Sequence, residues 1–352
     1  MPRHSATPQP QPLQGIRVVS LALNLPGPAA LMRLRAMGAN CVKVHSPAGD
    51  PMAQYSSAAY AQLHAGVRTL TLDLKTPQGQ AALHTELAQA HVLLTSFRPS
   101  ALRKLQLDWD TLHAVHPQLS MVCIVGSLGA RAEDPGHDLT YLAEHGLVTG
   151  TTLPATLYAD MAGALMATEA VLQAVLLHSL HGAATHAEVA LADAAAHLAL
   201  PRVWGLTAAA GGADTDTLGK PSHHAPGMVG GAHAGYRVYA CADGRVAVAA
   251  LEPHFAAALC SAAQWPIDAA IAVTNAQATT HPAKQTTQQH NTYSPQAITA
   301  AMLLPSTAQA LTVFFSTRTC QQLDALAAQH DLPLFCMPNQ PVTQVDPAQA
   351  AI

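Results

Sequence analysis

The sequence predicts an α/β fold in which helices cover a parallel sheet, followed by a smaller α+β domain. Short runs of Val, Ile, Leu and Thr recur between residues 16 and 125, and a stretch of helical pattern separates each run from the next. Strands that alternate with helices form right-handed βαβ units, which build parallel sheets. Farther along the chain, an Asp-Gly turn at Asp243 lies between two apolar runs, which predicts an antiparallel hairpin.

The elements of the first domain are assigned in chain order from composition and turn residues. Strands are expected over residues 16–21, 41–45, 69–74, 91–96 and 119–125. Helices are expected over residues 29–37, 77–89, 100–105, 109–116, 160–180 and 187–200. The turn Pro26-Gly27-Pro28 follows the first strand, and it lacks the glycine spacing that brings a backbone against a pyrophosphate. A nicotinamide cofactor is therefore not predicted.

The rest of the chain is expected to form a linker, a small domain and a C-terminal segment. Residues 205–234 are rich in Gly, Ser and His and are interpreted as a linker or an active-site loop. Helices are expected near residues 307–315 and 321–329, whereas the Thr- and Gln-rich residues 270–300 offer no packed core. The expected division is a tail over 1–12, a large domain over 13–204, the linker over 205–234, a small domain over 235–315 and the C-terminal segment over 316–352.

Composition excludes several classes of partner. The 352 residues include only 17 Lys and Arg against 21 Asp and Glu, so no nucleic-acid surface is expected. Charged residues such as Glu169 interrupt the apolar stretches, which predicts no membrane span. The six cysteines are too far apart in sequence to predict a metal site. The polar, Pro-rich start is interpreted as a disordered tail without a secretory signal, so a cytoplasmic protein is expected.

A carboxyl group inside an apolar, Ala-rich stretch is the first candidate for chemistry. Asp160 lies in the string Leu-Tyr-Ala-Asp-Met-Ala-Gly. Desolvation there would raise its pKa toward neutrality, as a proton-transfer catalyst near pH 7 requires. His137, in the string Gly-His-Asp-Leu-Thr-Tyr, is the candidate partner in an acid/base pair. Two simpler interpretations stay open, namely Asp160 as a helix N-cap and Asp138 as a structural residue.

Several strings in a fixed order resemble the family III CoA-transferases (CaiB/BaiF), and within them the α-methylacyl-CoA racemase branch. The strings are Leu13-Gln-Gly-Ile-Arg-Val-Val with Pro26-Gly-Pro, Met37-Gly-Ala-Asn-Cys-Val-Lys-Val, Leu70-Thr-Leu-Asp-Leu-Lys, Phe97-Arg-Pro-Ser, Pro135-Gly-His-Asp-Leu-Thr-Tyr, Tyr158-Ala-Asp-Met-Ala-Gly, and Cys241-Ala-Asp-Gly with Leu251-Glu-Pro-His-Phe. The resemblance covers most of residues 13–260. It implies a Rossmann-like large domain that binds CoA, a C-terminal segment that returns to that domain, and an interlocked homodimer.

The resemblance also implies roles for three residues. His137 and Asp160 match the two acid/base residues of the racemase, and Glu252 matches the carboxylate that partners the histidine. Inverting the carbon next to a thioester carbonyl requires a base on one face, a conjugate acid on the other, and stabilisation of the enolate oxygen between them. The expected reaction is therefore the epimerisation of a 2-methyl-branched acyl-CoA.

Cationic residues are implied as contacts of coenzyme A, which is expected as part of the substrate rather than as a permanently bound cofactor. Lys43 and Arg98 match positions that contact phosphate or adenine, Arg68 and Lys75 lie nearby in the strings, and Tyr141 belongs to the loop of His137. Bound CoA carries several phosphate charges, which such side chains would neutralise. No metal ion is expected.

Two other functions stay open. In the transferase branch the residue at the position of Asp160 is a nucleophile, which would make the protein an acyl-CoA:carboxylate CoA-transferase with a ping-pong course. The basic run that precedes the family's Leu-Thr-Leu-Asp-Leu-Lys string is reduced here to Leu63-His-Ala-Gly-Val-Arg. This reduction, together with the Thr- and Gln-rich residues 270–300, is the motive for a third hypothesis, a catalytically degenerate member that acts as a partner or scaffold.

Overall fold

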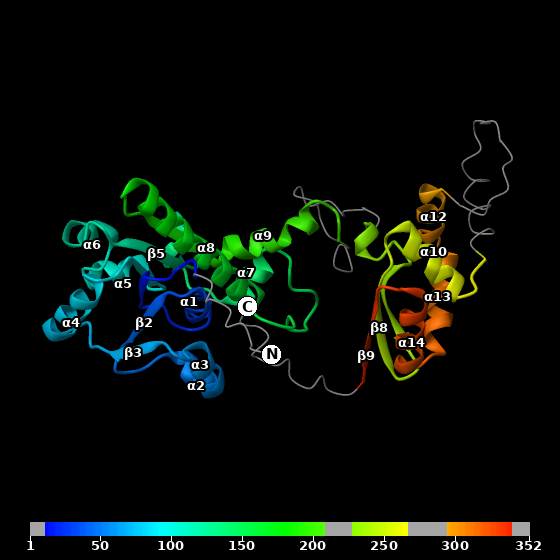
Figure 1. Cartoon of the computed structure of the whole chain (residues 1–352), viewed down its shortest axis with the longest axis horizontal. Helices are drawn as coiled ribbons and strands as arrows, with labels where there is room; N and C mark the ends of the chain where they lie inside the picture. The colour runs from blue at the N-terminus through cyan, green and yellow to red at the C-terminus, as the bar shows by residue number, and fades with distance from the viewer. Residues whose placement is uncertain (1–10, 208–226, 267–293, 340–352) are drawn as a thin grey trace, which may run out of the picture. The chain divides into compact units, whose positions relative to one another are not determined.

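The computed structural model describes residues 11–207, 227–266 and 294–339. These residues divide into two compact units (Figure 1). The first unit reaches Ala199, and the second begins at Leu200. Each unit has its own sheet and its own apolar core.

The first unit is built on a six-stranded sheet with the order β3-β2-β1-β4-β5-β6. Its strands are β1 (Arg17–Ser20), β2 (Asn40–His45), β3 (Arg68–Thr71), β4 (Val92–Thr95), β5 (Ser120–Val125) and β6 (His186–Ala190). All neighbouring strands are parallel, which confirms the predicted α/β fold. The strand order reverses between β1 and β4, and open sheets of this order receive ligands at that switch point, beyond the carboxyl ends of the strands.

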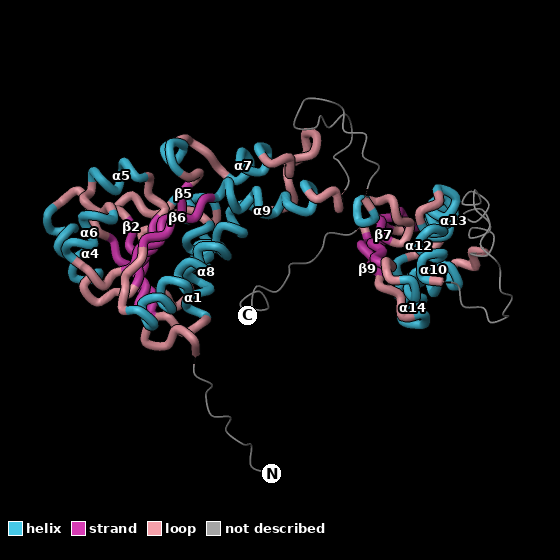
Figure 2. The backbone as a smooth tube through the Cα atoms, turned by 90° about the horizontal axis from the view of Figure 1, so that it is seen from above, coloured by secondary structure: helices cyan, strands magenta, loops and turns pink. Residues whose placement is uncertain are grey.

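Helices cover both faces of this sheet (Figure 2). The helices are α1 (Pro26–Ala36), α2 (Pro51–Tyr55), α3 (Ser57–Leu63), α4 (Pro77–Leu87), α5 (Pro99–Lys104), α6 (Trp109–Val115), α7 (Asp138–Glu144), α8 (Tyr158–His181) and α9 (Leu191–Val203), with a 3-10 turn over Gly129–Glu133. Successive strand residues point to opposite faces, so Val18 belongs to the core cluster under α1 and α8, and Val19 to the cluster under α4, α5 and α6.

The 24-residue helix α8 is long and apolar enough to cross a membrane by length and composition alone. Its small residues Gly163, Ala164 and Ala167 are buried, and it packs with α1 over the core of the first unit. One face of α8 packs on this core, and 33% of its apolar window is buried.

The predicted helix over residues 187–200 is corrected in its first part. His186–Ala190 is the edge strand β6, which pairs in parallel with β5 from Met121 to Val125. The helix α9 begins only at Leu191. The Ala-rich composition favours a helix, but pairing with β5 decides the backbone here, because tertiary contacts override weak propensities.

The second unit contains a three-stranded antiparallel sheet with the order β7-β8-β9. Its elements are β7 (Tyr236–Cys241), β8 (Gly244–Ala249), α10 (Pro253–Ala262), α12 (Pro295–Met302), α13 (Pro305–Ser316), α14 (Cys320–His330) and β9 (Leu334–Pro338), with a 3-10 turn over Met228–Gly230. The hairpin predicted around Asp243 is confirmed. Val246, Leu259 and Phe315 form part of its core.

The predicted boundary at residue 316 is wrong for the residues that the structure describes. α14 contributes Leu323 to the core of the second unit, and β9 adds the third strand to its sheet. Residues 316–339 therefore complete the second unit rather than return to the first. Residues 1–10 of the predicted tail (1–12), 208–226 of the predicted linker (205–234), 270–293 of the Thr- and Gln-rich stretch (270–300) and 340–352 of the C-terminal segment lie outside the described residues.

Candidate active site

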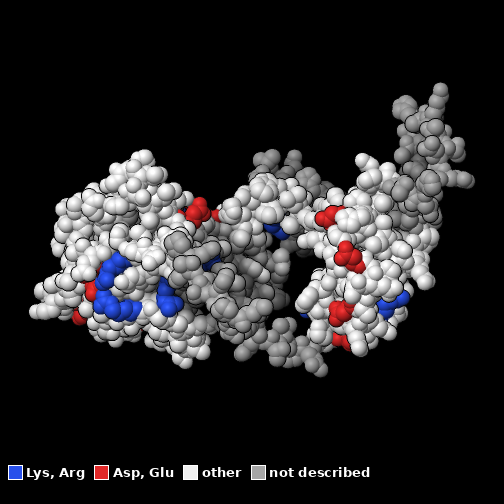
Figure 3. All heavy atoms as spheres, in the orientation of Figure 1, with Lys and Arg blue, Asp and Glu red and all other residues white. Residues whose placement is uncertain are grey.

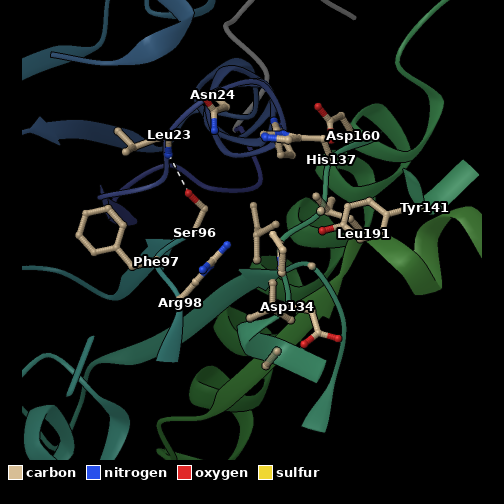
Figure 4. A pocket seen from close by; sticks show the side chains of 17 residues that line it. Leu23, Asn24, Ser96, Phe97, Arg98, Asp134, His137, Tyr141, Asp160 and Leu191 are labelled. Atoms are coloured by element: carbon tan, nitrogen blue, oxygen red, sulfur yellow. Dashed lines mark hydrogen bonds between the residues drawn. The ribbon is translucent and has the colours of Figure 1, made fainter. Parts of the chain in front are cut away.

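A pocket of about 270 Å³ lies at the carboxyl ends of the central strands of the first unit. Leu23 and Asn24 follow β1, Arg98 follows β4, and Gly126 follows β5, and all four line this pocket (Figure 4). β1 and β4 flank the switch point of the sheet. The pocket therefore lies where a sheet of this order binds its ligands.

Asp160 lines this pocket from the first turn of α8. The helix begins at Tyr158, so Asp160 is not the N-cap residue. Its backbone N–H donates to Asp138 Oδ1 at 3.0 Å. Burial raises the pKa of Asp160 to about 6, and the negative charge of Asp138 adds to this shift. A carboxyl group with a pKa near neutrality is suited to both accept and release a proton.

The pKa of Asp160 predicts a stability change in the Asp160→Asn variant. Because this pKa rises from 3.8 to about 6 on folding, the folded state loses stability as pH rises between these values. The ionised carboxyl costs roughly 3 kcal/mol above pH 6. In urea denaturation we expect the variant to be more stable than the wild type at pH 7.5 by up to about that amount, with a difference that shrinks toward pH 4.5.

Asp110→Asn is the matched control for this experiment, because Asp110 is an exposed acid in the first turn of α6. The control is expected to show no such pH-dependent gain. A stability difference between Asp160→Asn and wild type that is the same at both pH values would contradict the raised pKa.

His137 immediately precedes α7 and also lines the pocket. The Thr140 side chain fixes its backbone, because the His137 N–H donates to Thr140 Oγ1 at 3.0 Å and that hydroxyl donates to the His137 carbonyl at 2.7 Å. His137 is exposed, and its side chain lies near Asp160 in Figure 4. The structure thus brings together the two residues that the sequence singled out for acid/base chemistry.

Asp138 and Tyr141 support this part of the pocket from α7. Asp138 is buried and accepts the Asp160 N–H, which fits the structural interpretation of this residue. The Tyr141 hydroxyl lies against Gly126 and Gly136, and a Cβ atom at either glycine would collide with it. Because of this close contact, the pocket wall requires glycine at both positions. Burial also raises the pKa of Tyr141, and the charge of Asp160 adds to the shift.

Arg98 and Lys75, two of the residues predicted to contact CoA, line neighbouring hollows. The Arg98 side chain points into the pocket, and Arg98 forms no salt bridge with other residues in the described part of the chain (Figure 4). Lys75 is exposed and lines a second hollow of about 170 Å³, which shares Leu23 and Phe97 with the first. These two cations border adjoining hollows at one edge of the sheet.

Arg68 is not among the residues that line this pocket, and Glu252 belongs to the second unit. Arg68 is the first residue of β3, at the amino end of the strand, and pairs with Glu86, which also binds Arg17. Its predicted CoA contact is not supported by this placement, because the pocket lies at the carboxyl ends of the strands. Glu252 is the exposed N-cap residue of α10 in the second unit, and its pairing with His137 stays a prediction.

The predicted contact between Lys43 and a phosphate is also not supported. Lys43 lies inside the buried strand β2, and its side chain has no exposed surface. The Nζ atom donates to Asp50 Oδ2 at 2.8 Å and to the Ala22 carbonyl. Burial lowers the pKa of Lys43, and Asp50 opposes this shift. The chain has few charged residues, and they are sparse on the face of the protein shown in Figure 3. Two of these few charges are nevertheless fully buried as an ion pair, and their placement requires an explanation.

Replacing Lys43 with Met is expected to lower the free energy of unfolding by about 3–5 kcal/mol, because the substitution leaves the buried Asp50 carboxylate without its partner. Urea denaturation at neutral pH measures this change. Lys75→Met is the control, since Lys75 is exposed and substitutions at such positions change stability by about 0.5 kcal/mol or less. Equal stabilities of the two variants would contradict the role of the ion pair.

A possible metal-ligand group lies in the second unit. Cys241, Asp243 and Cys320 place one ligand atom each within 4.8 Å of the others. Asp243 Oδ1 already accepts the Cys320 N–H at 2.7 Å at the start of α14. Burial is the main cause that raises the pKa of Cys320, which keeps this thiol protonated. Asp243 therefore accepts a backbone N–H of the first turn of α14, and the two buried thiols lie beside it.

Sequence reasoning missed Asn24. This residue has a left-handed backbone with φ 62° and lines the pocket next to the switch point. Asn tolerates that conformation better than most residues, and its position in the loop after the first strand was the available signal.

Comparisons with known proteins agree with this fold. The family model "CoA-transferase family III" matches residues 13–350. The alpha-methylacyl-CoA racemase of Homo sapiens is 31% identical over 255 residues, which cover 69% of this chain and 62% of that protein. The cinnamoyl-CoA:phenyllactate CoA-transferase of Clostridium sporogenes is 35% identical over 151 residues, 39% of this chain and 36% of that enzyme. The matches to several such curated relatives span about half of their length or less.

Solved structures share the fold across nearly the whole chain. The crystal structure of a CaiB/BaiF family protein from Brucella suis has a TM-score of 0.68 at 23% identity and covers 97% of this chain and 86% of that one. A crystal structure of Rv3272 from Mycobacterium tuberculosis has a TM-score of 0.70 at 23% identity, with 92% and 83% covered. The strand order, the pocket at the switch point and the match over residues 13–350 lead to one conclusion, that this chain belongs to CoA-transferase family III.

Proposed function

We propose that the protein is an acyl-CoA racemase that epimerises a 2-methyl-branched acyl-CoA by removing and returning the α-proton through an enolate. The observation that carries the proposal is that His137 and Asp160 line one pocket, with the pKa of Asp160 raised to about 6. At pH 7 a group with such a pKa is mostly ionised, yet it is a strong enough acid and base to serve in both directions.

The proposed mechanism uses one residue on each face of the α-carbon. Asp160 accepts the α-proton of one enantiomer, the electron pair of the C–H bond moves onto the thioester oxygen, and protonated His137 delivers a proton to the opposite face. The reverse reaction begins with His137 as the base. We assign Glu252 as the carboxylate that partners His137, on the basis of the family strings, and Arg98 and Lys75 as contacts of the CoA phosphates.

The direct test is enantiomer interconversion. Enantiopure (2S)-2-methylacyl-CoA is incubated with the protein, the thioester is hydrolysed, and the acid is analysed by chiral chromatography. The proposal expects equal amounts of both enantiomers at equilibrium from either starting isomer. Retention of the starting configuration by folded protein that binds CoA would exclude racemisation.

A CoA-transferase is the second candidate. It is favoured by matches to several CoA-transferases, among them the succinate–glutarate CoA-transferase of Agrobacterium fabrum at 31% identity over 206 residues. In that reaction Asp160 attacks the donor thioester, which gives a mixed anhydride and free CoA thiolate. The thiolate then attacks the Asp160 carbonyl of the anhydride, so that an Asp160–CoA thioester forms and the donor acid leaves. Hydroxylamine trapping after incubation with acyl-CoA, followed by mass spectrometry, would modify Asp160 only in a transferase.

We further propose that the protein is a cytoplasmic homodimer that acts on acyl-CoA from lipid metabolism. Support for the dimer comes from three exposed apolar side chains of α8. Their exposed fractions are 51% for Leu165, 58% for Leu176 and 65% for Leu180. Contiguous exposed apolar surface marks contact sites. Light scattering should give twice the mass of 36.6 kDa, and a monomeric mass at micromolar concentration would exclude the dimer.

A further inference from the structure

The backbone of the loop between β1 and α1 is held in an unusual conformation by three separate contacts. Asn24 has φ 62°, a left-handed value that costs free energy in residues other than Gly. The Asn24 N–H donates to Asp50 Oδ1 at 3.1 Å, and the Leu23 N–H donates to Ser96 Oγ at 2.8 Å. Lys43 Nζ donates to the Ala22 carbonyl. Three consecutive residues of this loop are therefore fixed by side chains that lie far away in sequence.

The buried ion pair is directed at this loop. Lys43 and Asp50 have no exposed side-chain surface, and Asp50 Oδ1 also accepts the Met52 N–H at 3.0 Å. A buried pair is weak as a source of stability, because desolvation offsets its attraction. Its hydrogen bonds instead define one conformation for the loop. Strained backbone that is held by such over-determined contacts is typical of functional sites.

The Asn24 side chain is available to a ligand. Asn24 is half-buried and lines the pocket, on the wall nearest His137 and Asp160 in Figure 4. None of the described residues forms a hydrogen bond with its carboxamide. A neutral amide N–H is a donor for a carbonyl or enolate oxygen, and a fixed donor at developing negative charge is worth about 10²–10³-fold in rate.

We propose that the Asn24 carboxamide binds the thioester carbonyl oxygen of the acyl-CoA, and that the Lys43–Asp50 pair positions it. The proposal rests on the proposed function in that an acyl-CoA must occupy this pocket. It applies to enolate formation in a racemase and to the tetrahedral intermediate in a transferase, because negative charge develops on the same oxygen in both. Asn24 is thus a catalytic residue, and Lys43 and Asp50 are positioning residues.

The test is infrared spectroscopy of a 2-methylacyl-CoA that carries ¹³C at the thioester carbonyl, bound to wild type and to Asn24→Gly. Glycine accepts a left-handed backbone, so this variant removes the amide without straining the loop. We expect the bound carbonyl band of wild type to shift to lower wavenumber, and Asn24→Gly to lose the shift and about 10²–10³-fold in α-proton exchange. Affinity for free CoA, which has no thioester carbonyl, is expected to stay within twofold.

Gln106→Gly is the matched control, because Gln106 is an exposed carboxamide residue with a left-handed backbone of φ 56°. It should keep both the shift and the exchange. Asp50→Asn tests the positioning role and is expected to return the band toward its position in free substrate while free CoA still binds. If that variant does not fold, Ser96→Ala removes another anchor of the same loop and should have the same effect.

The outcomes separate this inference from the proposed function. A carbonyl shift that depends on Asn24 in a protein without α-proton exchange would support the inference and reject the racemase. Exchange by wild type that Asn24→Gly retains in full, with no change in the band, would overturn the inference and leave the racemase standing. Failure of wild type to bind the acyl-CoA would reject both.

Discussion

The Asp160→Asn substitution is expected to lower the interconversion of 2-methylacyl-CoA enantiomers by about 10²–10⁴-fold, the usual contribution of a positioned general acid or base. Asparagine has nearly the same shape but neither accepts the α-proton nor returns it. The structure places the carboxyl in the pocket with a pKa of about 6, so its loss removes the acid/base group that burial has tuned. Initial rates in both directions, followed by chiral analysis, measure the effect.

Asp134→Asn is the control for this prediction. Asp134 lines the same pocket, but it is exposed and pairs with Arg131 at 3.6 Å. Its substitution removes the same charge from the same pocket, and we expect a rate change of less than about threefold, since surface ion pairs contribute little. Equal losses in the two variants would show that the charge of the pocket, and not proton transfer by Asp160, controls the rate.

The His137→Gln substitution is expected to lower interconversion by a similar factor, because each face of the α-carbon requires its own base. The same substitution separates the two candidate reactions. A transferase that uses Asp160 as the nucleophile would still form a hydroxylamine-sensitive adduct in His137→Gln. Trapping and interconversion are therefore measured on the same preparation.

His145→Gln serves as the control for His137, because His145 lies at the other end of α7 and is half-buried. Full racemase activity in His137→Gln would contradict a two-base mechanism that includes this residue. Loss of activity in both histidine variants alike would instead point to damage to α7.

Local sequence was sufficient to predict most of the strands and helices of the first unit. The strands β1, β4 and β5 are buried almost throughout, so each appears in the sequence as a largely apolar run, whereas the residues of β3 are exposed or half-buried. β6 was not recognised because His186–Ala190 has a helix-like composition, and only its pairing with β5 makes it a strand. The short helix α7 was missed for a similar reason, since its seven residues are too few for a helical pattern to show.

The site was predictable where one residue was unusual for its surroundings. Asp160 could be singled out because a carboxyl is rare in an Ala-rich stretch, and the structure places it with His137 in one pocket. Lys43 could not be judged in this way, because its burial depends on Asp50, which is brought beside it only by the fold. The conformation of Asn24 likewise depends on contacts with side chains remote in sequence, which no local pattern reveals.

Two-base proton transfer by His137 and Asp160 can be tested by proton NMR of each enantiomer of a 2-methylacyl-CoA in D₂O with the wild-type protein. We expect that the α-proton signal of both enantiomers disappears and that the 2-methyl doublet collapses as deuterium enters. This proton transfer also implies a result for the variants. It predicts that Asp160→Asn and His137→Gln lose this exchange, while Asp134→Asn and His145→Gln keep it. A wild-type protein that binds CoA but leaves the α-proton of both enantiomers in place would contradict the proposed racemase mechanism.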